Sequence, residues 1–304
     1  MDFKRKEEIE QIRRKYGHQL SSHAFDSLWI WKEKMGLTIY QETDFFMVKS
    51  TVYGENAWFF PCGNKEKKKR FLQEQMQKQE VFTLFYLREE DLDFLEQEYP
   101  SCFQITEMPE GEEYLYSRQE FETLSGKRFA GFRKQIHRLE RTHEMKAVLC
   151  DESNIADVEA VLGKHSGTGH KEGFARLQDE GVAVRAWEYR KELGLFGVLV
   201  YVDQKPAAVA FGFPLADGIL DGCLEKHDPE ISGLAYYTQR AFFLLSDESF
   251  CLMNGEEDLG IAGLRMMKHH MAPVSKNKVW MAKYRAETKK GGELSNEKKR
   301  TGPV

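Results

Sequence analysis

Three consecutive carboxylates, Glu256, Glu257 and Asp258, follow Asn254 at the end of a short apolar segment and precede Gly260. An apolar run of this kind predicts a strand, and open α/β sheets bind ligands where such strands end. Carboxylates at that place can hold an ammonium group or take a proton from an attacking amine. We therefore take the three acids as candidate catalytic residues, with Asn254 and Gly260 as candidate substrate-binding positions.

Two cationic residues, Arg265 and Lys268, follow on a segment with helical periodicity, residues 261–271. An arginine can hold a phosphate or carboxylate with two parallel hydrogen bonds, so both residues are candidates for binding an anionic group of the substrate. The apolar face of the segment is expected to pack on a sheet; it consists of Ile261, Leu264, Met267 and Met271. A plainer interpretation stays open, in which the acids only complement the N-terminus of this helix.

A further basic set lies between Lys127 and Lys146. Arg133 and His137, four residues apart on a predicted helix, would reach toward the site from a linker and are candidate substrate-binding residues. The same patch could instead follow a phosphate backbone, which would suit a tRNA. A third interpretation is a solvated helix face that joins two domains.

The elements that must position these residues alternate between helices and strands in both halves of the chain, which predicts an α/β (α+β) fold. We expect one domain over residues 1–143, including a linker helix over 117–143, and a second domain over 144–285 that carries the site. Residues 286–304 are polar and are expected to be a disordered tail. The clearest hairpin joins two apolar runs through the turn at 203–206.

Composition excludes several classes of protein. The 304 residues are 41% hydrophobic with a formal net charge of -5, which supports a real core and argues against a broad nucleic-acid-coating surface. The longest apolar run, 193–202, is far short of the roughly 20 residues of a membrane helix. Scattered cysteines and the lack of a signal peptide favour a cytoplasmic protein.

No metal site is predicted. His165 and His170 lie in a glycine-containing segment, 163–173, that we interpret as a flexible loop or lid, and His269 and His270 are adjacent on a helix. Neither pair directs two ligands at one ion.

The stretch "NGEEDLGIAGLRMMKHHMAP" resembles the N-x-E-E-D-x-G-x-x-G-L-R-x-x-K signature of the phosphatidylglycerol lysyltransferase C-terminal domain family. Three other stretches follow in the family's order: "YLYSRQEFETLSGKRFAGFRKQIHRLE", "GCLEKHDPEISGLAYYTQRAF" and "VWMAKY". The resemblance covers about residues 20 to 285. Gly255 stands where the family pattern usually has Arg or a similar residue.

The resemblance implies two tandem GCN5-related acetyltransferase-like domains, each with a mixed, mostly antiparallel sheet flanked by helices. It also implies transfer of an aminoacyl group, which membrane-bound members move from a charged tRNA to a lipid. In acetyltransferases coenzyme A docks at the helix start that corresponds here to Ser232 and Gly233, so these are candidate cofactor-binding residues. Lys226, on the preceding strand, is a candidate substrate-binding residue. The usual glycine-rich loop is missing from that helix start.

These features favour an aminoacyl- or acyltransferase that uses an amine or hydroxyl acceptor. No cofactor is certain, and acyl-CoA or aminoacyl-tRNA is a possible donor. The acceptor would be a small molecule or a peptide, and the oligomeric state is open. The alternative is a non-enzymatic module that binds a small metabolite or peptide in a degenerate transferase cleft.

Overall fold

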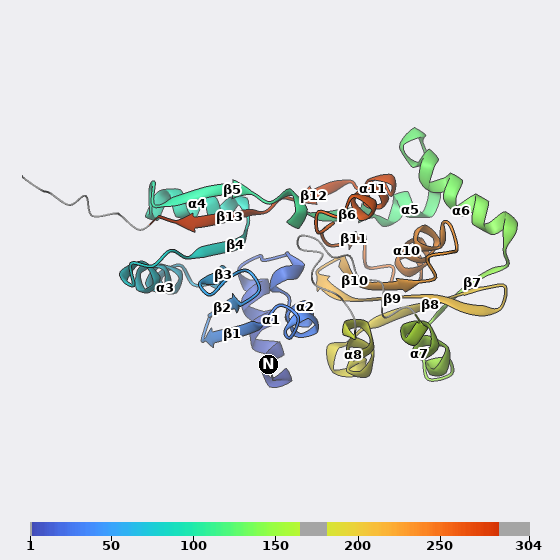
Figure 1. The fold of residues 1–304 in the computed structure, drawn as a ribbon, viewed down its shortest axis with the longest axis horizontal. Coiled ribbons are helices and arrows are strands. Elements are labelled where there is room, and N and C mark those ends of the chain that lie inside the picture. Colours follow the sequence, from blue (N-terminus) through green and yellow to red (C-terminus); the bar gives the residue numbers. More distant parts are fainter. Residues whose placement is uncertain (1, 165–180, 286–304) are drawn as a thin grey trace, which may run out of the picture.

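Two mixed β-sheets form the framework of the protein in a computed structural model that describes residues 2–164 and 181–285 (Figure 1). The first sheet has the order β1-β2-β3-β4-β13-β5, with bounds Leu37–Glu42, Phe45–Ser50, Ala57–Gly63, Thr83–Leu87, Trp280–Tyr284 and Phe103–Glu107. The second has the order β12-β6-β11-β10-β9-β8-β7, with bounds Ser275–Asn277, Glu113–Ser117, Leu252–Asn254, Ile219–His227, Lys205–Ala216, Phe196–Val202 and Met145–Leu149. The predicted fold class, α/β with two mixed and mostly antiparallel sheets, is confirmed: each sheet contains one parallel pair, β3–β4 or β10–β11.

The sheets exchange strands. Strand β6 comes from the first half of the chain but pairs with β11 and β12 in the second sheet. Strand β13 comes from the end of the chain but lies between β4 and β5 in the first sheet. Figure 1 shows β13, in red, among the strands of the first sheet. The division at 143/144 stays a prediction, and neither sheet is built from one side of it alone.

Helices cover both faces of the second sheet. On one face lie α7, α8 and α9 (Ile155–Lys164, Val182–Glu188, Arg190–Leu193), and on the other α5, α6 and α10 (Arg118–Thr123, Ala130–Thr142, Leu234–Leu245). Strand β8 is therefore buried on both sides: Leu199 joins one core, and Val198 and Val200 join the other. This explains why its sequence is a continuous apolar run. The remaining helices are α1 (Lys6–Lys15), α2 (Phe25–Trp31), α3 (Lys65–Gln77), α4 (Glu89–Glu98) and α11 (Ala262–His270).

The hairpin between β8 and β9 turns on two residues, Asp203 and Gln204, both with positive φ (50° and 65°). Positive φ at both central positions is typical of the tight turn that matches strand twist. The prediction of this hairpin is confirmed.

The expected linker helix over 117–143 is not continuous. Helix α5 ends where Leu124 takes a left-handed conformation (φ 46°), and Gly126 follows with φ 88°. The chain then restarts as α6 at Ala130. Arg133 explains part of the break, because its guanidinium donates hydrogen bonds to the carbonyls of Leu124 and Gly126.

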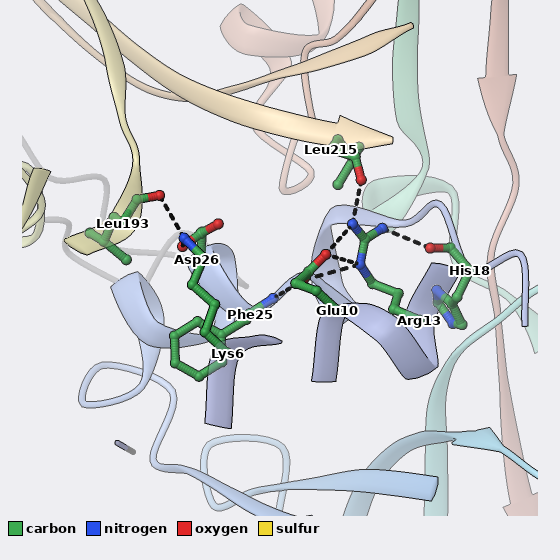
Figure 2. A network of polar contacts seen from close by, with 8 residues as sticks. All are labelled: Lys6, Glu10, Arg13, His18, Phe25, Asp26, Leu193 and Leu215. Atoms are coloured by element: carbon green, nitrogen blue, oxygen red, sulfur yellow. Dashed lines mark hydrogen bonds and ion pairs between the residues drawn. The ribbon is translucent and has the colours of Figure 1, made fainter. Parts of the chain in front are cut away.

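Helix α1 ties the first sheet to the second through a buried polar network (Figure 2). Arg13, 1% exposed, donates to Glu10, to the His18 carbonyl and to the Leu215 carbonyl at the end of β9. Lys6 binds Asp26 at 2.6 Å and the Leu193 carbonyl at 2.8 Å. Since charges are costly to bury alone, these contacts fix how the two parts of the molecule meet.

Candidate functional site

The acidic stretch forms an irregular loop after β11, and buried side chains of neighbouring strands hold it in place. Asn254 is fully buried; its amide nitrogen donates to Glu113 at 2.8 Å and its oxygen accepts from the Glu256 amide at 2.8 Å. Glu256 and Leu259 adopt positive φ (55° and 54°), which is uncommon for such residues and is found often at functional sites.

The acids do not cap the following helix. Helix α11 starts at Ala262, its N-cap Ile261 makes no side-chain capping bond, and its first turn contains no acid. The plainer interpretation of the stretch is therefore wrong for this chain.

The third acid of the stretch points away from the other two. Asp258 is fully buried and accepts hydrogen bonds from the Tyr114 hydroxyl at 2.6 Å and from Nε and Nη2 of Arg265, each at 2.8 Å. The Gly260 amide donates a further bond at 2.9 Å. Burial by itself would raise the Asp258 pKa, but these hydrogen bonds outweigh it and hold the pKa below its ordinary value. Arg265 and Asp258 thus brace the loop.

A cavity of about 330 Å³ lies where the two sheets meet, and Glu256 and Glu257 form part of its wall. The first sheet and its helices contribute mainly apolar and aromatic side chains, namely Leu28, Trp31, Met35, Leu37, Tyr53, Phe59 and Tyr86. The opposite wall comes from β10, α10, the acidic loop and α11. Ile261, Leu264, Met267 and Met271 line this cavity. Met267 and Met271 also pack against the core of the second sheet, as expected for this apolar face.

Asp221, on β10, lies directly behind Glu256. It is fully buried, and neither of its oxygens accepts a hydrogen bond from an N–H or O–H group within the described residues. Burial is the main cause that raises the pKa of both Asp221 and Glu256 well above ordinary values. The charge of Glu113 adds to the rise at Asp221, where a hydrogen bond with Glu256 opposes it, and the charge of Asp221 adds to the rise at Glu256. Both shifts favour the protonated form of these buried carboxyl groups.

Lys268 is the cation of this wall. Its ammonium donates to the carbonyls of Gly255 and Glu257, the latter at 2.6 Å, and only 7% of the residue is exposed. Burial lowers its pKa, while Glu257 and Glu256 act in the opposite direction. Burial is also the main cause of the raised pKa of Glu257, which Lys268 opposes. Lys268 and the two glutamates thus lie together in this wall.

Tyr53 and Tyr86 form the facing wall, where their hydroxyl groups are 2.7 Å apart. Tyr86 has φ 58° within strand β4, an unfavourable conformation for a large residue. Burial raises the pKa of both tyrosines, and the charge of Glu257 raises it further. Tyr53, Tyr86 and Glu257 thus line the same cavity.

Other predicted site residues lie elsewhere. Arg133 is bound to carbonyls of the α5–α6 connection, and His137 is exposed on α6. Neither they nor Lys226, Ser232 and Gly233 line the cavity. A Cβ on Gly233 would lie 2.9 Å from the backbone oxygen of Gln135, so the start of α10 packs closely against α6.

Sequence reasoning missed the contributions of the first sheet and of β10. Tyr53, Tyr86 and Trp31 reach the site from elements far away in the chain, and no local spacing marks them. Asp221 and Glu225 carried a usable signal, since a charged residue within an apolar strand needs a partner or a role.

Two predictions fall partly or wholly outside the structural description. The segment 163–173 with His165 and His170 lies almost entirely outside the described residues, and the expected tail, 286–304, lies wholly outside them. Within 2–164 and 181–285, no cluster of three or more His, Cys, Asp or Glu side chains is arranged to hold a metal ion. In the same ranges, no helix combines the length and hydrophobicity required to cross a membrane.

The model of the family described as "Phosphatidylglycerol lysyltransferase, C-terminal" matches residues 13–283. The chain belongs to this family. The acidic loop that forms part of one cavity wall lies within the residues matched by the phosphatidylglycerol lysyltransferase C-terminal family. No curated protein matches the chain significantly.

Solved structures show the same fold. A conserved protein of unknown function from Bacteroides thetaiotaomicron VPI-5482 is similar with TM-score 0.80 and 24% identity, over 94% of this chain and 98% of that one. The C-terminal domain of a putative lysylphosphatidylglycerol synthetase from Agrobacterium fabrum gives TM-score 0.64 at 13% identity, over 93% and 92%. L-PGS from Bacillus licheniformis gives TM-score 0.60 at 15% identity, over 92% of each chain.

Proposed function

We propose that the chain is an aminoacyl- or acyltransferase that moves an acyl group onto an amine or hydroxyl acceptor held in the cavity. One observation carries the proposal: Glu256 and Glu257 face an otherwise largely apolar cavity, with buried Asp221 behind them. Electrostatic attraction is stronger in such a low-dielectric setting, so these carboxylates would bind an ammonium group or take its proton.

The cavity is small for the donors considered. A volume of about 330 Å³ is at the lower end of the roughly 300–1,000 Å³ usual for ligand pockets. It would hold the acyl or aminoacyl part of a donor with a small acceptor, while the body of coenzyme A or of a tRNA stays outside. Both donors are cytoplasmic compounds, which places the proposed reaction in the cytoplasm.

A transfer assay tests the proposal. Purified protein is incubated with a panel of acyl-CoAs and charged tRNAs and with candidate amines, and product is followed by mass spectrometry. Glu257→Gln is expected to lower the rate by about 10²-fold or more, the usual contribution of a charged group that binds or deprotonates the nucleophile. Glu248→Gln, which changes an exposed acid in the α10–β11 connection, is the matched control. Equal rates for the wild type and Glu257→Gln would exclude the proposed role.

The alternative, a binding module without chemistry, is supported by the packing of Gly233. The start of α10, where acetyltransferases dock their cofactor, lies against the α6 backbone at Gln135. This alternative predicts that a metabolite co-purifies or raises thermal stability without any transfer. Native mass spectrometry of the purified protein separates the two: bound acyl-CoA favours the transferase, and an unrelated metabolite favours the module.

A further inference from the structure

Three side chains of the cavity wall, His227, Glu225 and Gln239, form a hydrogen-bonded chain that is separate from the acidic loop. Nδ1 of His227 lies 2.8 Å from Oε1 of Glu225, two residues earlier on β10. Nε2 of Gln239, on α10, donates a hydrogen bond to the other oxygen of Glu225. All three residues line the cavity. The His227 side chain is 34% exposed and that of Glu225 is 12% exposed, so the carboxylate lies behind the imidazole ring.

This geometry selects one tautomer of the neutral imidazole. A carboxylate is only an acceptor, so the proton of His227 resides on Nδ1 and the lone pair on Nε2. The bond from Gln239 in turn fixes the rotation of the Glu225 carboxylate. A nucleophile, a base and a group that orients the base are the recurring parts of acyl transfer. Here the last two are present at the wall of the cavity.

We infer that His227 is a catalytic residue that accepts the proton of the acceptor, with Glu225 and Gln239 as positioning residues. The inference rests on the proposed function and assigns the proton transfer of that reaction to His227. Glu256 and Glu257 then have the separate role of binding an ammonium group. The acceptor nitrogen or oxygen forms a bond to the acyl carbon while its proton passes to Nε2 of His227. The acyl carbon then releases the thiolate or alkoxide of the donor, which takes that proton from Nε2, so His227 ends each turnover neutral.

Burial and the neighbouring carboxylates act in opposite directions on the pKa of His227. Burial lowers the His227 pKa, but the hydrogen bond and charge of Glu225 outweigh burial, so the pKa lies above its ordinary value. Lys226 opposes this rise and Asp228 adds to it, and Asp228 is itself bound by Lys164 of α7 at 3.0 Å. A base whose pKa lies close to the working pH is the most effective.

The molecule contains a matched control pair. Nδ1 of His143, directly after α6, lies 2.7 Å from Oδ2 of Asp203 in the β8–β9 turn. Neither residue lines the cavity. This pair reproduces the histidine–carboxylate contact without access to the proposed site.

The test compares His227→Gln, Glu225→Gln and Asp203→Asn with the wild type, using the acyl donor and amine for which the wild type shows transfer. We expect His227→Gln to lower kcat by about 10²-fold or more with KM changed less than about threefold. Glu225→Gln should lower kcat less and move the acidic limb of the pH–rate profile to lower pH. Asp203→Asn should leave both unchanged. NMR titration of the imidazole signals should show the His227 pKa falling in Glu225→Gln only, and the circular dichroism of each variant checks its fold.

Unchanged kcat in a folded His227→Gln protein would overturn the inference while leaving the proposed function in place. An unchanged His227 pKa in the Glu225→Gln variant would also overturn the inference. Absence of transfer by the wild type with every donor would remove the proposed function and this role together, so the two failures are distinguishable.

Discussion

At the scale of single residues, the Asp221–Glu256 pair is the feature that sets the site apart from an ordinary cavity wall. The folded state raises the pKa of both acids above their unfolded values of about 3.9 and 4.3. Folded protein therefore binds more protons than unfolded protein between those values and the raised pKa. The contribution of this pair to stability is therefore largest at the acidic end of this window and decreases as pH rises through it.

Asp221→Asn should remove much of this pH dependence. The new amide can donate to Glu256, and one of two repelling carboxylates disappears. We expect the free energy of unfolding at pH 8 to rise by about 1–3 kcal/mol, the usual cost of an unsatisfied buried polar group, with a smaller gain at pH 5. Urea unfolding from pH 5 to pH 8 measures it. Asp217→Asn, which changes an exposed acid in the turn that leads into β10, should alter the pH dependence of stability little. If the free energy of unfolding depended on pH equally in both variants, this explanation would be contradicted.

Residue types alone identified the acidic stretch but could not assign its members. Nothing in the spacing shows that Asp258 turns toward Arg265 and Tyr114 while Glu256 and Glu257 face the cavity. That choice depends on the positive φ of Glu256 and Leu259 and on the buried amide of Asn254. Helix periodicity in α11 did locate an apolar face correctly, but it could not show that this face, besides packing against the core of the second sheet, also lines a cavity.

At the scale of elements, Gly255 shows why the loop leaves β11 as it does. A Cβ there would lie 2.7 Å from Cε2 of Tyr116, on the adjacent strand β6. Tyr116 is fully buried, and its hydroxyl donates to the Lys268 carbonyl at 3.1 Å, so it has little freedom to move. The glycine at position 255 is thus tied to the packing of a tyrosine under the loop.

Gly255→Ala should destabilise the protein by about 1–3 kcal/mol, as is typical when extra volume enters a packed site. Gly131→Ala is the matched control: it lies in helix α6, and a Cβ there meets nothing within 4 Å. The control should raise stability by roughly 0.5–1 kcal/mol, because alanine restricts the unfolded chain. Thermal unfolding of both variants provides the comparison. Unchanged stability of Gly255→Ala would show that the Tyr116 side chain can shift at little cost.

At the scale of the whole molecule, the order of helices and strands was predictable because each has its own periodicity. The exchange of β6 and β13 was not, since short segments such as 113–117 and 280–284 contain no signal for the sheet they join. The hydrogen bond from Arg13 to the Leu215 carbonyl could not be predicted from the sequence either, because it joins parts of the chain about two hundred residues apart. Long-range pairing of this kind is decided by the packing of the complete fold.

The exchanged strands and the Arg13 network predict that both sheets unfold together, even if the chain divides at 143/144. Leu87 on β4 and Leu199 on β8 are fully buried, in the first and second sheet respectively. Leu87→Ala and Leu199→Ala should each cost about 2–5 kcal/mol, and hydrogen exchange should report that loss at the slowest amides of both sheets. If each variant weakened protection only in its own sheet, the sheets would be separate cooperative units. Because the cavity lies between them, equal losses would mean that the proposed site exists only when the whole fold is formed.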